Sequence, residues 1–144
     1  MTYCTRADLE KRYSNKEVSD LLDRNNDGQD DAGAFAEREA DAAGIINSYI
    51  ATQYALPLPV VPALIKFAAC SITRYLLWDD NRPQSVSEDY DETIKQLEQV
   101  RDDALKLTDN AGNILPPPAT NTSGGVDYFA EERVFTRDSL SGFG

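Results

Sequence analysis

Residues 23–31, with the sequence DRNNDGQDD, have the types and spacing of a calcium-binding loop. Asp23, Asn25 and Asp27 match the first, third and fifth positions of such a loop, and Asp31 matches the ninth. Gly28 stands at the sixth position, where the loop turns sharply. Calcium prefers carboxylate and amide oxygens at alternating positions, so the four oxygen-bearing residues are the candidate metal ligands.

The match to a calcium loop is incomplete at its end. Ala34 occupies the twelfth position, which normally supplies a bidentate glutamate, and Asp30 occupies the usually apolar eighth. The simpler interpretation is an Asx-type turn around residues 26–28, with Asp31 capping the helix that follows. A weak calcium site, the centre of a small calcium-binding interaction module, stays open as the alternative.

The sequence has no residue pattern that predicts catalysis. It contains no histidine, which removes the commonest general base and the commonest transition-metal ligand. Pairs of adjacent carboxylates occur at 79–80 and 102–103, but neighbouring positions on a helix diverge by about 100° and do not face each other. We therefore expect no enzymatic activity, no catalytic residue and no cofactor apart from the possible calcium.

The two cysteines, Cys4 and Cys70, have two interpretations. Cys70 falls within the apolar pattern of an expected helix, where a reduced core cysteine is the common case. A disulfide between Cys4 and Cys70 is the less favoured alternative, because the chain is expected to be made in a reducing cytoplasm.

The spacing of the apolar residues predicts an all-α fold, a small bundle of about four to five helices. The expected helices run from Thr5 to about Tyr13, from Ser14 to the acidic loop, over about 31–50, from Pro62 to about Asp79, and from Ser85 or Ser87 through Leu105. The helix at 62–79 is apolar on more than one face, so it should be the central buried one. The last helix should lie on its surface.

The composition changes beyond Thr108, and the change divides the chain into a helical body, 1–108, and a long extended C-terminal arm, 109–144. Three consecutive prolines and a pair of glycines make 109–125 a non-helical spacer. Aromatic and apolar residues return in 126–144, and such residues need a partner to cover them. We expect this docking segment to bind a partner protein, by strand addition in the simplest case.

The net charge of −11 argues against binding to a phosphate backbone. The sequence shows neither an apolar run of 18 or more residues nor an N-terminal signal pattern. We therefore expect no membrane span, and we expect synthesis in the cytoplasm.

Four segments of the chain resemble the head-tail adaptor, or neck, proteins of Mu-like tailed bacteriophages and prophages. These segments are TRADLEKRY, LLDRNNDGQDD, INSYIATQYALPLPVVPALIKFAACSITRYLLWDD and the terminal FTRDSLSGF. They span nearly the whole chain in the expected order, and the YALPLP stretch followed by an apolar helix ending in RYLLW is the most specific of them.

The resemblance implies a structural virion protein that forms a ring, of twelve subunits, at the neck of the phage. Such a ring would join the portal to the stopper, or tail-completion protein, and genomic DNA would pass through its lumen without specific binding. An acidic lining would suit that passage, because like charge repels the DNA. The resemblance also implies that the arm reaches into the portal ring, through the residues Val134, Phe135, Arg137, Asp138, Leu140 and Phe143.

Overall fold

Two short helices, α1 (Arg6–Arg12) and α2 (Asn15–Leu22), open the chain in this computed structural model, which describes residues 2–119. Each begins at the side-chain cap that the sequence predicts. The Thr5 hydroxyl accepts a hydrogen bond from the Asp8 amide, and the Asp8 carboxylate accepts one from the Thr5 amide, which completes a capping box. Ser14 caps α2 by accepting a hydrogen bond from the Glu17 amide.

Helix α3 (Ala34–Ile50) begins later than the sequence predicts. Asp31 does not cap it, so that prediction is wrong: its carboxylate instead accepts a hydrogen bond from the Arg24 amide at 3.0 Å. A turn separates Asp31 from the helix, and Gly33 stands at the helix start with φ +77, a conformation that glycine adopts without strain.

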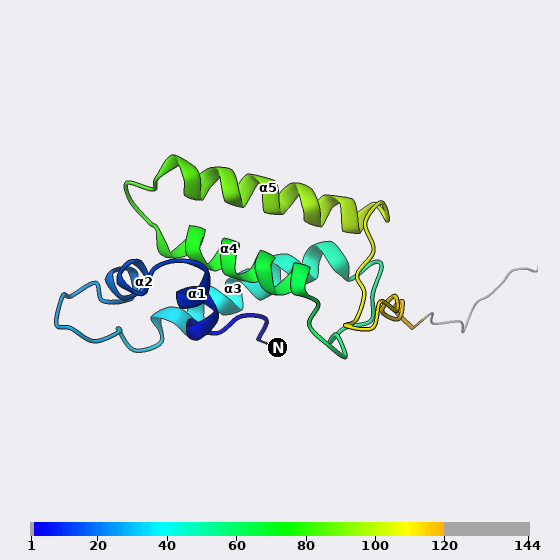
Figure 1. Ribbon diagram of the computed structural model, residues 1–144, viewed down its shortest axis with the longest axis horizontal. Helices are drawn as coiled ribbons and strands as arrows, with labels where there is room; N and C mark the ends of the chain where they lie inside the picture. The colour runs from blue at the N-terminus through cyan, green and yellow to red at the C-terminus, as the bar shows by residue number, and fades with distance from the viewer. Residues whose placement is uncertain (1, 120–144) are drawn as a thin grey trace, which may run out of the picture.

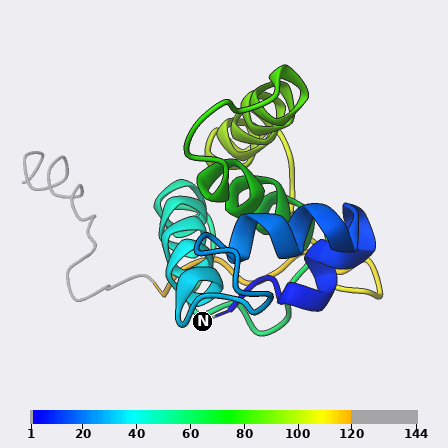
Figure 2. The same ribbon diagram turned by 90° about the vertical axis from the view of Figure 1, so that its left-hand side faces the viewer.

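Helix α4 (Ala63–Leu77) is the central helix, as predicted. It lies between α5 on one side and α1, α2 and α3 on the other (Figures 1 and 2). Pro62 precedes it as the N-cap rather than forming its first turn, and Trp78 caps its other end. Eight of its residues are buried: Ile65, Ala68, Ala69, Cys70, Ser71, Ile72, Thr73 and Leu77.

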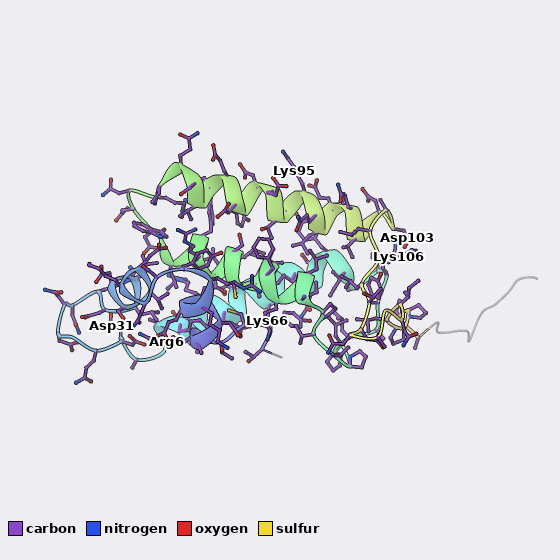
Figure 3. The ribbon with its side chains drawn as sticks, in the orientation of Figure 1. Arg6, Asp31, Lys66, Lys95, Asp103 and Lys106 are labelled. Atoms are coloured by element: carbon purple, nitrogen blue, oxygen red, sulfur yellow. The ribbon has the colours of Figure 1, made fainter. Side chains whose placement is uncertain are left out.

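Helix α5 (Gln84–Arg101) lies on the surface of α4 and α3, as predicted, but its ends differ from the expected ones. It starts directly after Pro83, whose fixed φ suits a helix entry. It stops before Ala104 and Leu105, because Asp103 adopts a left-handed conformation with φ +65. The Lys106 ammonium lies 2.5 Å from the Asp103 carboxylate in this turn, while Lys95 projects from the outer face of the helix (Figure 3).

The all-α prediction is confirmed for residues 2–119, which contain five helices and no strand. The core consists mainly of apolar side chains from α3, α4 and α5, and Leu9 and Leu22 extend it beneath the two short helices. Residues 109–119 are non-helical, as expected. The division into a body at 1–108 and an arm at 109–144 stays a prediction, and the structure adds that Leu115 is buried in the same core.

Candidate functional site

The residues expected to bind a partner lie outside the described part of the chain. They are Val134, Phe135, Arg137, Asp138, Leu140 and Phe143. The structure does describe how the chain leaves the helical body on the way to them. The candidate functional features within residues 2–119 are this exit, the metal-loop candidate and the surface grooves.

The exit of the chain is anchored to the loop that follows α3. The Ala55 amide donates a hydrogen bond to the Pro116 carbonyl at 3.0 Å, and the Leu107 amide donates one to the Tyr54 hydroxyl at 2.8 Å. The Leu115 amide donates to the Leu107 carbonyl at 3.0 Å, and the Leu115 side chain is only 5% exposed. The chain is therefore held to the body up to Pro116, eight residues past the expected end of the body.

Two exposed apolar side chains flank this exit. Leu56 is 37% exposed and Ile114 is 61% exposed, and no other large hydrophobic side chain within residues 2–119 is as exposed as these two. Each lies within two residues of the hydrogen bond between Ala55 and Pro116. We call Leu56 and Ile114 the exit patch. Sequence reasoning missed it, since single apolar residues among prolines and polar residues carry no periodic signal.

The residues of the metal-loop candidate lie together, but their oxygens are turned toward backbone amides. The two carboxylate oxygens of Asp23 accept hydrogen bonds from the amides of Asp27 and Gly28, at 2.9 and 2.8 Å. The side chain of Asn25 accepts from the Asp27 amide, and Asp27 accepts from the Gln29 amide. These are the Asx-type turns expected from the sequence. Asp31 faces the Arg24 amide instead.

Within residues 2–119 no group of three or more His, Cys, Asp or Glu is arranged to hold a metal ion. The calcium site stays a prediction, and the amide contacts give it a discriminating test. We expect Asp23→Ala to lower the free energy of unfolding by about 1 kcal/mol in buffer containing a chelator, because two amides lose their acceptor. Denaturant unfolding measures this, with Gln29→Ala in the same loop as the control. If Asp23→Ala lowered the free energy of unfolding only when calcium is present, the result would instead support the metal site.

Arg74 joins four elements through its guanidinium. It donates two hydrogen bonds to the Glu17 carboxylate, at 2.6 and 3.1 Å, and lies 4.1 Å from the centre of the Tyr13 ring. Asp89 on α5 lies 3.4 Å away, and the Trp78 indole donates to the same Glu17 carboxylate at 3.2 Å. Arg74 and Lys66 are the two basic residues of a mainly apolar helix, and a largely buried charge such as that of Arg74 needs a partner, so the sequence held a signal that such a carboxylate exists.

These contacts make stability depend on pH through Glu17. Burial alone would raise the pKa of Glu17, but the hydrogen bonds from Arg74 and Trp78 lower it below its ordinary value. A carboxyl whose pKa is lower in the folded state stabilises the fold above its unfolded pKa of about 4.3, and loses this contribution as the pH falls through the folded value. We expect the stability difference between the wild type and Glu17→Gln, measured by urea unfolding, to narrow as the solution is made acidic. A constant difference would contradict this.

Three of the four adjacent carboxylates, those of Asp79, Asp102 and Asp103, form ion pairs at the surface. Asp79 pairs with the Arg24 guanidinium at 2.6 Å, which lowers the pKa of Asp79, and Arg24 also donates to the Leu77 carbonyl. These contacts hold the acidic loop against the end of α4. Asp102 accepts a hydrogen bond from Arg101 at 3.1 Å. Asp79 and Asp80 both line a small surface hollow that Asp20 also borders, but the Arg24 guanidinium lies in the same hollow and pairs with Asp79.

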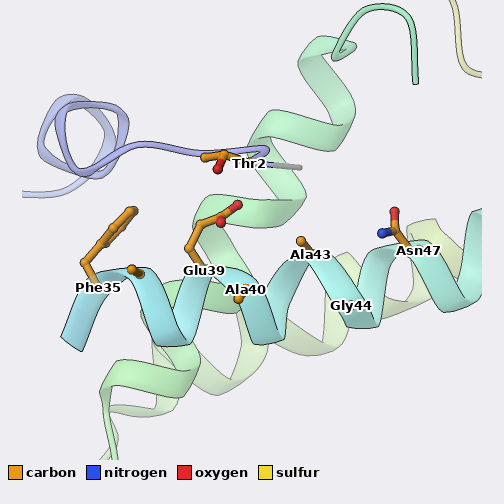
Figure 4. A pocket seen from close by; sticks show the side chains of 8 residues that line it. Thr2, Phe35, Glu39, Ala40, Ala43, Gly44 and Asn47 are labelled. Atoms are coloured by element: carbon orange, nitrogen blue, oxygen red, sulfur yellow. The ribbon is translucent and has the colours of Figure 1, made fainter. Parts of the chain in front are cut away.

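A shallow groove of about 440 Å³ runs along α3, where small residues leave room beside Phe35. Figure 4 shows Ala40, Ala43 and Gly44 along the helix, with the Glu39 side chain rising toward Thr2. Glu39 is 5% exposed, and its carboxylate accepts a hydrogen bond from the Tyr3 amide at 2.7 Å. Glu39 thus holds the N-terminal segment on α3, and the groove lies beside that contact.

A second groove, of about 620 Å³, lies between α3 and α5. Its apolar walls come from Ile45 and Tyr49 on α3 and from Tyr90 and Ile94 on α5. The Tyr90 ring stacks on Tyr75, with the ring centres 3.8 Å apart. Both grooves are open to solvent, and their walls are mainly apolar.

Comparison with protein families identifies the chain. A sequence profile of the family described as "Bacteriophage Mu, Gp36" matches residues 3–124, which include all five helices. The chain belongs to the Bacteriophage Mu Gp36 family. The matched residues also include the anchored exit, and they end just before the expected docking segment at 126–144.

Two proteins of Mu and of a Mu-like prophage are similar to this Gp36 family member. "Gene product J" of Escherichia phage Mu is 36% identical over 104 residues, which are 71% of this chain and 73% of that protein. "Mu-like prophage FluMu protein gp36" of Haemophilus influenzae is 33% identical over 105 residues, 73% of this chain and 74% of that protein. The resemblance to proteins of Mu-like phages is therefore confirmed at the level of the family.

This Gp36 family member has no described helix suited to a membrane: none within residues 2–119 is both long and apolar enough to cross one.

Proposed function

We propose that this protein is a structural subunit of the phage neck, a head-tail adaptor without enzymatic activity. In this proposal the subunits form a ring, of twelve copies, between the portal and the stopper or tail-completion protein of the virion. The arm residues bind the portal, and genomic DNA passes through the ring without specific binding. Membership of the Gp36 family places the chain among proteins of Mu-like phages, and the adaptor role goes beyond that membership.

The anchored exit is the observation that favours an adaptor. The helical body holds the chain by the bond between Ala55 and Pro116 and by the buried Leu115, and then releases it through three consecutive prolines. Prolines favour an extended, stiff chain, which suits a spacer between the body and a docking segment. A helical body that anchors the first residues of an arm by hydrogen bonding and burial is suited to connecting two assemblies.

The charge of the outer helix suits a channel for DNA. Helix α5 carries the acidic residues Glu88, Asp89, Asp91, Glu92 and Glu98 against the basic residues Lys95 and Arg101. A ring interior lined by such a surface would repel the phosphate backbone and leave no basic traps for it. Ring formation also raises the effective concentration of each arm once a neighbouring arm has bound.

Removal of residues 126–144 tests the role of the arm. We expect the truncated chain to keep the helical circular dichroism of the full chain and to lose binding to the purified portal protein by at least about 100-fold, because multivalent binding is lost with the arm. Surface plasmon resonance on immobilised portal rings measures this. The full chain with Phe135, Leu140 and Phe143 changed to alanine should also fail to bind, while Ser139→Ala is the control within the same segment.

Unchanged portal binding by a folded truncated chain would contradict the assignment of the arm. Rotationally averaged electron microscopy of the full chain mixed with portal tests the ring itself. Twelve-fold density on one end of the portal is expected, and a monomer that never joins the portal would contradict the adaptor.

A further inference from the structure

The two cysteines of the chain lie side by side in the core although 66 positions separate them in the sequence. The Cys4 and Cys70 sulfurs are 3.1 Å apart, and both residues are free thiols. Cys4 precedes α1 and is 1% exposed, while Cys70 lies in the middle of α4 and is 0% exposed. The contact joins the N-terminal segment to the central helix.

We propose that Cys4 and Cys70 form a site of oxidative modification, a dithiol that closes to an internal disulfide when the protein meets a small-molecule disulfide. The sulfur atoms, now 3.1 Å apart, need to approach by only about 1 Å to reach the bond length of about 2.05 Å. The proposal concerns the helical body alone, so it is independent of the arm and of the adaptor role.

The N-terminal segment gives a small reagent a route to these buried sulfurs. Residues 2–5 form no helix and are held on α3 by two hydrogen bonds, from the Tyr3 amide to Glu39 at 2.7 Å and from the Tyr3 hydroxyl to Asn47 at 2.6 Å. Opening of a terminal segment costs less free energy than global unfolding. In this proposal, a brief opening of residues 2–5 separates Cys4 from Cys70 and admits the small disulfide while α3 and α4 stay packed.

The thiol–disulfide exchange needs no reagent besides the small-molecule disulfide. The hydrogen bond with Cys4 and the charge of Arg12 lower the pKa of Cys70, against the effect of burial, whereas the pKa of Cys4 is raised. The Cys70 thiolate attacks the small disulfide and releases one small thiolate, which takes up a proton. The Cys4 sulfur then attacks the sulfur of Cys70, forms the internal bond and releases the second small thiol. The two electrons lost by the cysteines reside in the two released thiols.

The disulfide would fasten the N-terminal segment to α4 and restrict the unfolded chain by a closed loop spanning the 66 positions. A loop of that length raises the melting temperature by on the order of 10 °C in a domain of this size. A protein made in a reducing cytoplasm would thus become more stable after it leaves the cell.

The test uses the full chain, first reduced and then incubated with oxidised glutathione under native conditions. We expect mass spectrometry to show the loss of two hydrogens with no retained glutathione, and calorimetry to show the rise in melting temperature. The Cys4→Ala protein should retain one glutathione on Cys70 and show no such rise. Cys70→Ala is the second variant, chosen over serine because alanine keeps the core apolar.

Two free thiols after prolonged incubation of the native wild type would overturn the proposal. So would a wild type that retains two glutathiones without forming the internal bond. Should either variant fail to fold, the masses of the oxidised wild type before and after reduction still decide between these outcomes.

Discussion

Replacing Arg74 with alanine should lower the free energy of unfolding by about 3 kcal/mol, because it leaves the Glu17 carboxylate with a charge that burial penalises. The exposed fractions of the two side chains are only 15% and 22%, so water screens the pair weakly. The same change removes the contact with the Tyr13 ring and the link to Asp89 on α5. Denaturant unfolding followed by circular dichroism measures the loss.

The pair between Lys16 and Asp20 provides the control for Arg74. These side chains are 85% and 64% exposed, and water and salt screen the attraction of so exposed an ion pair. Lys16→Ala should therefore leave stability nearly unchanged. Arg74→Lys keeps the charge but loses the paired geometry of the guanidinium, so its loss should be intermediate. Equal effects of Arg74→Ala and Lys16→Ala would show that the four elements are not joined through this residue.

The second large effect should come from Leu115, the buried residue at the base of the arm. Leu115→Asp should lower the free energy of unfolding by about 3 kcal/mol, because apolar burial is lost and a carboxylate cannot be buried there without a partner. The neighbouring substitution Ile114→Asp is its matched control. Ile114 is 61% exposed, so the same new charge should change stability by no more than about 0.5 kcal/mol.

Limited proteolysis distinguishes local detachment of the chain exit from global unfolding in these two variants. Cleavage near Lys106 should become faster in Leu115→Asp at denaturant concentrations where α3 and α4 remain folded, since Leu115 bonds to Leu107 next to that site. If Ile114→Asp were cleaved as fast as Leu115→Asp, the burial of Leu115 would not be what anchors the exit.

Local sequence signals predicted most of the helical fold. The caps at Thr5 and Ser14 defined two helix starts correctly, because a cap depends on residues only three positions apart. The start of α3 was misplaced, since it depends on the left-handed backbone at Gly33, which the acidic sequence around it does not specify. The predicted end of α5 was wrong for the same reason, because it depends on the left-handed backbone at Asp103.

Most contacts between distant residues could not be predicted from the sequence. The prolines around Leu115 have the composition of a linker, yet Leu115 is buried in the core. Its amide bonds to the Leu107 carbonyl, and the Leu107 amide bonds to the hydroxyl of Tyr54, 53 positions earlier in the chain. The pairing of Arg74 with Glu17 likewise follows from tertiary packing. Cys4 and Cys70 could be named from the sequence as a possible disulfide pair, but their contact as two free thiols is determined by the packing. The metal ligands proposed in the acidic loop and the portal-binding residues of the arm stay predictions.

The hydrogen bond between Ala55 and Pro116 determines where a mechanical load would enter the subunit. A pull on the chain beyond residue 119 would be resisted first by this bond and by Leu115 in the core, both beside the loop that follows α3. Helices α3 and α4, which pack against each other in the core, are the elements next to this anchor (Figure 1). In the proposed adaptor, a load on the arm would therefore pass through α3 and α4, the most extensively packed pair among the described helices.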